Sequence, residues 1–332
     1  MIVRLLASLL LTSSTLVAQT GTLVVVNQKQ HAVDLVDPVT RAVLAAVSVG
    51  VNGHEIALGK DGRLAYVPIY SNTGVGKPGT DGQMIDVIDL ATAKVVREID
   101  LGHPVRPHKP VFGPDGLLYV TAELDQAIDV VDVDKGVVVG QVPTGQPQSH
   151  ILGLSADGRR GYTANVGAGS VSVLEMKERK LIKVIPLTKR VQRIAVSNDG
   201  QWVFTSDADQ PRVAAIRTRT NALGQWIAVE GIPYVTQPTP DGRYLLVAAA
   251  KDEKGVLNVV DLKTMKVVRT IPTAAPVVSF LVHEGHVYMS CAANGAVEVL
   301  DVRATEAEKW ALETPIQLAP GVDAMAWTMA AK

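Results

Sequence analysis

The chain has only one cysteine, Cys291, among its 332 residues. A single thiol excludes an intramolecular disulfide, a CxxCH haem-attachment site and a CxxC redox pair. Cys291 lies in the apolar stretch VYMSCAA. Because free cysteine is among the most frequently buried residue types, this context predicts a buried and unreactive thiol.

An excess of either charge is also lacking. The 32 Lys and Arg residues nearly balance the 33 Asp and Glu residues, and the two signs are mixed along the chain. We therefore expect no nucleic acid partner, because such a partner requires a basic surface. Hydrophobic residues make up 47% of the chain, which is enough for a sizeable core. Repetitive all-β sequences of this length can form one domain.

No stretch approaches the roughly 20 uninterrupted apolar residues of a transmembrane helix. The first residues, MIVRLLASLLLTSSTLVAQ, combine Arg4 with a short apolar segment and the small residue Ala18. This pattern is typical of a secretory signal peptide. We predict a signal peptide at residues 1–18 and a periplasmic or secreted mature chain, residues 19–332, without a transmembrane span. A retained membrane anchor is the alternative.

A turn signal recurs along most of the chain. Asp-Gly pairs begin at positions 61, 115, 157, 199 and 241, and Glu-Gly begins at 284, so the steps are 54, 42, 42, 42 and 43 residues. Asp-Gly between alternating apolar runs predicts a β-hairpin, because Gly accepts a positive φ there. A period near 42 residues is typical of the four-stranded blade of a β-propeller.

Six complete units cover roughly residues 52–320, and the two ends of the chain supply a seventh. The segment GVDAMAWTM matches the first strand of a unit, whereas TLVVVNQKQHAVDLVDPVTRAVLAAVSV matches the second, third and fourth. Pairing the two ends closes the ring and removes free sheet edges. We predict an all-β fold: one seven-bladed β-propeller domain with four-stranded blades and a one-plus-three closure.

Several of these units carry a recognisable motif. The stretches GLLYVTAELDQAIDVVDV, RRGYTANVGAGSVSVLEM and VLNVVDLKTMKVVRTI resemble YVTN repeats, and Tyr119–Thr121 and Tyr162–Asn165 come nearest to the signature. The whole mature chain resembles the YncE-like propellers. This resemblance implies an extracytoplasmic binding or scaffold propeller. It also implies distant relatives among the β-chains of quinohaemoprotein amine dehydrogenases and among lactonases of similar shape.

Histidine recurs at one position of three successive units. Stepping back seven residues from each turn, and matching strands in the closing blade, gives His54, His108, His150, Gln192, Tyr234, Val277 and Asp323. The first strand of a propeller blade lines the central channel, so these positions predict a ring at the channel entrance.

Three converging imidazoles predict a site for zinc, copper, iron or nickel that leaves one coordination position open. Asp323 or Gln192 is the expected fourth ligand or polar orienter. Inheritance of the same residue by duplicated blades, without any metal, is the alternative.

The first unit is longer than the others because of the segment SNTGVGKPGTDGQ, residues 71–83. It joins the second and third strands, so it emerges on the side of the channel where the histidines lie. A tolerated surface insertion is one interpretation of this segment. The other is a lid over the ring, with Lys77 in reach of a ligand.

Further polar residues lie near the predicted entrance. Arg106 and Lys109 bracket the second histidine, Arg193 follows Gln192, and Tyr234 belongs to the ring. Cationic side chains there favour an anion such as a carboxylate or a phosphate. Solvated surface charges are the alternative.

Three functions remain open. The first is an exported monomeric propeller that binds a small molecule or an extracytoplasmic protein. The second is a metal-dependent hydrolase, lyase or oxidase with His54, His108 and His150 as ligands. The third is an accessory subunit of a dehydrogenase complex, which only the resemblance implies. No HExxH or GxSxG motif is present, so no catalytic residue is assigned.

Overall fold

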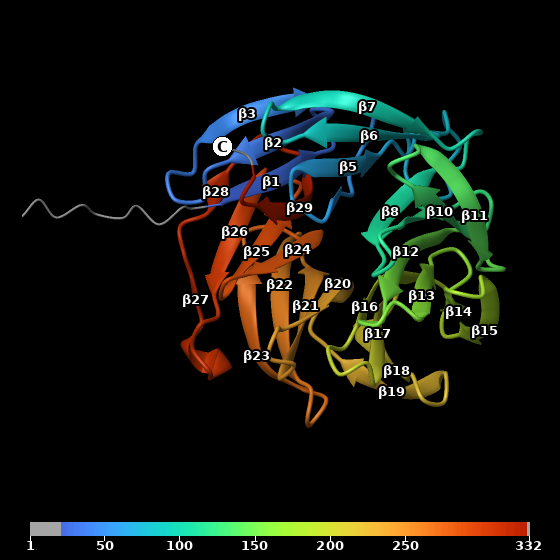
Figure 1. Cartoon of the computed structure of the whole chain (residues 1–332). Helices are drawn as coiled ribbons and strands as arrows, with labels where there is room; N and C mark the ends of the chain where they lie inside the picture. Colours follow the sequence, from blue (N-terminus) through green and yellow to red (C-terminus); the bar gives the residue numbers. More distant parts are fainter. Residues whose placement is uncertain (1–20, 331–332) are drawn as a thin grey trace, which may run out of the picture.

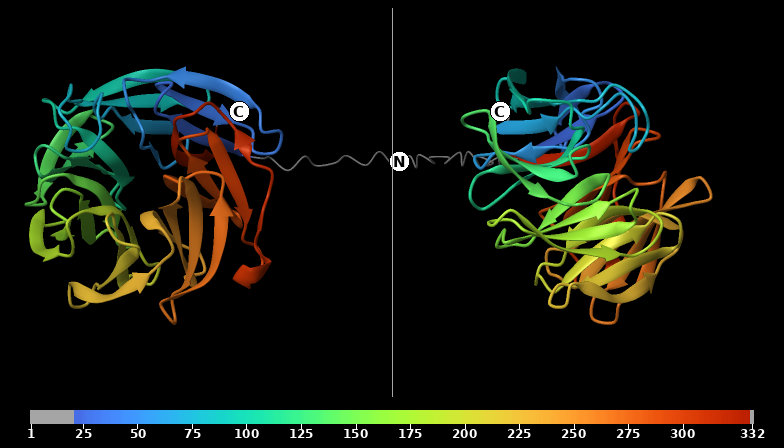
Figure 2. Two further views of the ribbon diagram at one scale, coloured as in Figure 1. Left: turned by 180° about the vertical axis from the view of Figure 1, so that it is seen from behind. Right: turned by 90° about the vertical axis from the view of Figure 1, so that its right-hand side faces the viewer.

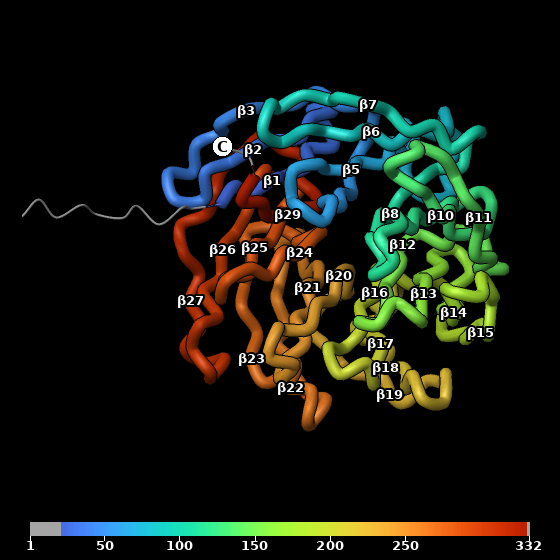
Figure 3. The backbone as a smooth tube through the Cα atoms, viewed as in Figure 1, coloured from blue at the N-terminus to red at the C-terminus, as the bar shows by residue number. Residues whose placement is uncertain are grey.

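Residues 21–330 form a ring of seven β-sheets in the computed structural model, which describes this part of the chain (Figures 1 and 2). Each sheet is an antiparallel blade, and the backbone visits the blades in sequence order around the ring (Figure 3). The predicted seven-bladed β-propeller is confirmed. The predicted signal peptide lies outside the described residues. Within residues 21–330, no helix is long and apolar enough to span a bilayer.

The first three blades contain the three aligned histidines or the segments next to them. Blade one consists of β4 (Ala57–Leu58), β5 (Leu64–Pro68), β6 (Met84–Asp89) and β7 (Lys94–Asp100). Blade two consists of β8 (Pro107–Phe112), β9 (Leu118–Ala122), β10 (Ala127–Asp132) and β11 (Val137–Pro143). Blade three consists of β12 (Ser149–Leu154), β13 (Arg160–Asn165), β14 (Ser170–Glu175) and β15 (Lys180–Pro186).

The next three blades run from the lower right of the ring in Figure 1 to its left side. Blade four consists of β16 (Val191–Val196), β17 (Trp202–Asp207), β18 (Arg212–Arg217) and β19 (Ala222–Ala228). Blade five consists of β20 (Ile232–Pro238), β21 (Tyr244–Lys251), β22 (Lys254–Asp261) and β23 (Lys266–Thr273). Blade six contains β24 (Ser279–His283), β25 (His286–Cys291), β26 (Ala296–Asp301), β27 (Ala311–Leu312) and β28 (Ile316–Gln317), with the 3₁₀ helix η1 at Ala307–Lys309.

Blade seven joins the two ends of the described chain. Its order is β29 (Val322–Thr328), β1 (Thr22–Asn27), β2 (Ala32–Val36) and β3 (Val43–Ser48), and Val24 of β1 faces Ala326 of β29. The Asn27 amide donates to the Ala319 carbonyl at 3.0 Å, which fixes the connection that leads into β29. The one-plus-three closure predicted from the sequence is confirmed.

The hydrophobic core lies between neighbouring blades. One buried cluster joins Val33 and Leu35 of blade seven to Ala65, Val67 and Ile88 of blade one. Each sheet packs between two neighbouring blades, one on each face. Its inner strands are therefore apolar on both sides. Cys291 belongs to such a cluster, and burial raises the pKa of its thiol to about 12, which agrees with the unreactive thiol expected from the sequence.

Two blades depart from the regular pattern. In blade six the fourth strand is split into β27 and β28, which pair with opposite ends of β26. In blade one the first strand is only the two residues of β4. Gly53 makes only an isolated bridge with Ile69, so His54 and Glu55 lie in an irregular segment just before β4. These two side chains are therefore placed by contacts with other blades and not by the sheet.

Replacing one buried carboxyl group by an amide is expected to stabilise the fold. Asp129 is 1% exposed, and burial raises its pKa to about 6 from the usual 3.8. A raised pKa means that the folded state disfavours the ionised acid, so stability falls as pH rises from about 4 to 6. Asp129→Asn keeps an acceptor for the Gln141 amide, which donates to Oδ1 at 2.8 Å. We expect D129N to be about 1–3 kcal/mol more stable at pH 7 in urea unfolding.

The same variant should have almost no advantage at pH 4, where Asp129 is protonated in the folded state. Blade five provides the precedent, because Asn258 occupies the matching strand position and its amide group bonds both the N–H and the carbonyl of Glu230. A D129N protein that is less stable than the wild type at pH 7 would contradict this account.

Candidate metal centre

Three imidazoles meet at the start of the innermost strands of blades one, two and three. Nε2 of His54 lies 2.5 Å from Nε2 of His108, and the ring centroids of His108 and His150 are 3.5 Å apart. One ring nitrogen of each histidine lies within 4.8 Å of the others, and all three side chains are buried. The structure thus brings together the three residues that the repeat alignment singled out. Within residues 21–330 they are the one group found with the spacing of a metal site.

A local backbone feature precedes each of these histidines. Two positions earlier lie Asn52, Arg106 and Gln148, with φ values of 61°, 53° and 56°. Left-handed φ values are uncommon for residues other than Gly and cluster at functional sites. The repeated conformation turns the chain at the same point in three blades, so each histidine leaves the connection in a similar direction.

Two of the histidines also lie at β-bulges. The pairing of β8 with β9 shifts between Pro107 and Pro110, and that of β12 with β13 shifts between Ser149 and Ile151. A bulge adds one residue to one strand and re-aims its side chain. The hydroxyl of Thr121, in the YVT stretch of β9, donates to the His150 carbonyl at 3.0 Å and accepts from the Lys109 N–H at 2.8 Å. This threonine therefore satisfies backbone groups that the two bulges leave unpaired.

The protonation of the imidazoles suits a metal ligand set. Burial lowers the pKa of His54 to about 4, and burial together with the neighbouring imidazoles holds the pKa of His108 well below its usual value. His54 Nδ1 lies 3.0 Å from the Asn52 carbonyl, so Nδ1–H donates there and Nε2 keeps its lone pair. Nδ1 of His108 and of His150 are buried without a hydrogen-bond partner. Neutral imidazoles with free nitrogens are the form that binds transition metals.

Two residues that the sequence did not single out complete this cluster. Tyr70 follows β5, and its ring packs edge-on against all three imidazoles at centroid distances of 5.3, 5.3 and 5.8 Å. Its hydroxyl donates to Glu123 Oε2 at 2.5 Å. The same oxygen lies 3.4 Å from His150 Nδ1, which is an ion-pair distance but too poorly aligned for a hydrogen bond.

Glu123 is ionised at neutral pH. Burial raises the pKa of this carboxyl group, but His150, Tyr70 and Arg106 outweigh burial and lower it below its usual value. Glu123 is therefore a buried anion beside the cluster of three imidazoles. A carboxylate beside a metal-binding histidine orients the imidazole when the two groups align in a hydrogen bond.

The inserted loop, residues 71–83, is attached to the three connections that lead to the histidines. The Asn52 amide donates to the Ser71 carbonyl at 2.5 Å. The Arg106 guanidinium forms an ion pair with Asp81 and donates to the Lys77 carbonyl at 2.7 Å. Gly76 packs on Gln148, because a Cβ atom there would lie 2.5 Å from the Gln148 amide nitrogen. The loop thus makes contact with blades one, two and three.

Two predicted ligand contacts differ from the structure in this loop. Lys77 meets Arg106 through its backbone carbonyl and not through its ammonium group. Arg106 itself is neutralised by Asp81, because the loop brings this carboxylate against its guanidinium group. Arg106 is therefore not a free receptor for an anion.

A buried ion network lies directly beside the histidines. Glu55 accepts from Lys109 Nζ at 2.7 Å and also pairs with Arg193, which belongs to blade four and so reaches across the channel. Arg193 also lies 3.4 Å from Asp323 and 5.6 Å from the ring centroid of Tyr234. The anions that Lys109 and Arg193 were expected to bind are thus carboxylates of the protein itself.

The two expected orienters of the metal are placed differently. Asp323 faces Arg193, and burial raises the pKa of its carboxyl group. In β16 the register shifts between Gln192 and Ile194, so the bulge gives the channel position to Arg193. Gln192 instead pairs with Ser206 of β17. Counting seven residues back from the turn therefore selects a residue one position away from the channel in this blade.

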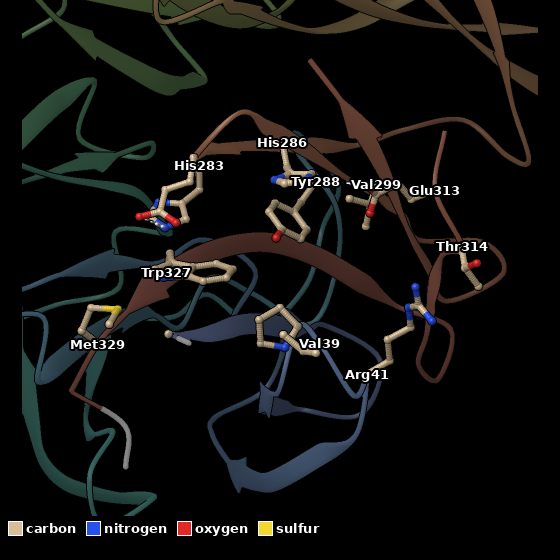
Figure 4. Close-up of a pocket in the computed structure, with 13 residues that line it drawn as sticks. Val39, Arg41, His283, His286, Tyr288, Val299, Glu313, Thr314, Trp327 and Met329 are labelled. Carbon is tan, nitrogen blue, oxygen red and sulfur yellow. Dashed lines mark ion pairs between the residues drawn. The ribbon is translucent and has the colours of Figure 1, made fainter. Parts of the chain in front are cut away.

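A separate cavity of about 420 Å³ lies between blades six and seven (Figure 4). His283 stacks on Trp327 with ring centroids 4.2 Å apart, and His286 lies 3.6 Å from the Glu313 carboxylate. The two residues face each other in the β24–β25 hairpin, but their imidazoles contact different groups, so they were not found as a set of metal ligands within residues 21–330.

Comparison with known proteins supports the fold. No family model matches the chain. Antigen Lp49 of Leptospira interrogans is 22% identical over 193 residues, and the match covers 51% of this chain and 41% of that protein. The chain thus matches less than half the length of this relative, and the predicted YncE-like family is not confirmed.

Solved structures resemble the whole ring. A chain of Kuenenia stuttgartiensis hydrazine synthase superposes with a TM-score of 0.66 at 17% identity, covering 82% of this chain and 88% of that chain. The dihydro-heme d1 dehydrogenase NirN in complex with DHE superposes with a TM-score of 0.65 at 13% identity, covering 96% and 77%. At such identities the likeness concerns the fold and not the activity. The chain is a seven-bladed β-propeller.

Proposed function

We propose that this protein is an exported YncE-like β-propeller that binds one transition-metal ion through His54, His108 and His150, and presents it to a ligand or partner at the channel entrance. The observation that carries the proposal is the set of three buried imidazoles whose ligand nitrogens lie within 4.8 Å of one another. The export and the periplasmic or secreted location rest on the N-terminal sequence pattern. The partner is a small molecule or an extracytoplasmic protein, and the propeller acts as a monomer.

The donor set limits the choice of metal. Imidazole nitrogen suits zinc, copper, iron and nickel, and three protein ligands leave a coordination position open. A bound ion would supply a Lewis-acidic positive charge at the channel entrance. Elemental analysis of tag-free protein, after exposure to each metal separately and dialysis, is the direct test.

A metal-dependent hydrolase, lyase or oxidase is the second candidate function. It is favoured by Glu123, an ionised carboxylate that lies 3.4 Å from His150 and is joined to Tyr70. A carboxylate so close to a metal site can accept a proton from a bound ligand. Turnover of a substrate by the metal-loaded protein, absent in the metal-free protein, would distinguish this function from binding alone.

Changing Glu123 tests how the cluster is organised. Glu123→Gln removes the negative charge and offers an N–H to His150 Nδ1, so the imidazole loses the group that orients it. We expect the Kd for zinc at pH 7 to rise about 10- to 100-fold, measured by competition with a chromophoric chelator. Glu298→Gln is the matched control, because Glu298 is a buried carboxylate in blade six that accepts from the Ala274 N–H at 2.9 Å. Equal zinc affinities of E123Q and E298Q would show that Glu123 does not position His150.

A further inference from the structure

The inserted loop and blades two and three border a cavity of about 320 Å³ that is open to solvent. Its polar and apolar walls include Lys77, Arg106, Glu123, Leu124, Gln126 and Gln148. Arg106 and Glu123 are only 5% and 3% exposed. Their charged groups are therefore held in place by the surrounding protein and are not mobile surface side chains. The cavity is therefore a pre-formed pocket with fixed hydrogen-bonding groups.

This pocket adjoins the histidine cluster. Glu123 lines the cavity, and its Oε2 atom lies 3.4 Å from His150 Nδ1 and 2.5 Å from the Tyr70 hydroxyl. A single carboxylate thus separates the cavity from the imidazoles. A molecule in the pocket lies next to the proposed metal site without having to pass the ion network around Glu55.

The charges of the wall favour a neutral ligand. The positive charge of Arg106 is balanced by Asp81, and Lys77 and Glu123 carry opposite charges. These four charges sum to zero, so a ligand with a net charge gains no net Coulomb attraction from the wall and still loses its hydration. Carboxylate, amide and guanidinium groups together offer both acceptors and donors, and a hydroxyl group both donates and accepts.

We infer that the cavity binds a small neutral polyol, of a size between glycerol and a monosaccharide. A volume of 320 Å³ corresponds to about ten water molecules, which leaves room for a ligand of this size. This inference deepens the proposed function. It rests on that function in one respect, because it takes the three histidines to be the metal centre beside the pocket.

Calorimetric titration of the metal-loaded full chain tests the inference with glycerol, meso-erythritol, D-xylose and D-glucose as neutral probes. Lactate and methylammonium are the charged comparisons. We expect at least one neutral probe to bind with a Kd below about 10 mM, and more tightly than either charged probe. Absence of saturable binding by all four neutral probes, or tighter binding of a charged probe, would overturn the inference.

A substitution that fills the cavity locates the binding. Leu124 is 47% exposed and lines the pocket, so Leu124→Trp should raise the Kd of the polyol at least about tenfold without unfolding the chain. Leu223→Trp is the matched control, because Leu223 is 38% exposed on the outer strand β19. Unchanged polyol binding by L124W would place the ligand elsewhere and refute the assignment.

The same variants separate the two proposals. L124W should keep its full metal content, because Leu124 is not one of the three imidazoles. A variant with His54, His108 and His150 changed to alanine should lose the metal. If the wild type binds polyol but no metal, the proposed function fails and the pocket stands; if it binds metal but no polyol, the reverse holds.

Discussion

Replacing His54, His108 and His150 together by alanine is expected to abolish metal binding while leaving the propeller folded. Wild-type protein without a histidine tag should hold about one equivalent of a first-row transition metal, and the triple variant less than about a tenth of this amount. The physical reason is that the three imidazoles supply all the ligands that the site offers. Elemental analysis after overnight dialysis measures both values.

The control is a variant in which His103, His283 and His286 are replaced by alanine, because it removes the same number of imidazoles. The imidazoles of these residues contact Asp125, Trp327 and Glu313, and none belongs to the cluster of His54, His108 and His150. This variant should keep the full metal content. If neither the wild type nor the control retains metal, and both have the circular dichroism spectrum of a folded β-protein, the metal site does not exist and a metal-free binding propeller remains.

The second large effect concerns stability. Glu55 is 1% exposed and balances both Lys109 and Arg193, so Glu55→Gln leaves a buried guanidinium group poorly compensated. We expect E55Q to lose about 3–5 kcal/mol of unfolding free energy in urea at pH 7, because an unpaired buried charge is strongly destabilising. Replacing Glu55 and Arg193 together by Met should recover at least about 2 kcal/mol of this loss, because the buried cation is then removed as well.

The acid response gives an independent measurement of the same network. Although burial raises the pKa of Glu55, Arg193 and Lys109 outweigh it and hold the pKa well below the usual 4.5. A depressed pKa contributes stability above pH 4.5 that is lost as pH falls further. The stability difference between the wild type and E55Q should therefore shrink below pH 4.5. A difference that stays constant down to pH 2.5 would show that the Glu55 charge is not what stabilises the fold.

The sequence predicts the fold well because the turn signal is local and repeated. Asp61 and Gly62 illustrate this: Gly62 has a φ of 70°, and the Asp61 carboxylate accepts from the Arg63 N–H at 3.0 Å. The same chemistry at each repeat fixes the hairpin, and the spacing fixes the blade. Closure of blade seven follows from the same pattern, because its strands are merely divided between the two ends of the chain.

The site is less predictable because irregular backbone and non-repeated residues build it. The alignment selects the three histidines, but the bulge in β16 moves Arg193 into the position expected for Gln192. A bulge changes the count by one residue, and period-two reasoning then selects the wrong side chain. Tyr70 and Glu123 belong to no aligned set, and only the three-dimensional arrangement of the blades shows that they meet His150.

The closure of blade seven also has a consequence for biosynthesis. β1 ends at Asn27, whereas its partner β29 begins only at Val322. A nascent chain therefore carries β1 with one unpaired edge until nearly every other blade has been made, and such an edge is a template for pairing with another molecule. Completion of the ring as the last step of folding follows from this connectivity. Proteolysis that removes β29 would convert the closed propeller into an aggregation-prone open ring.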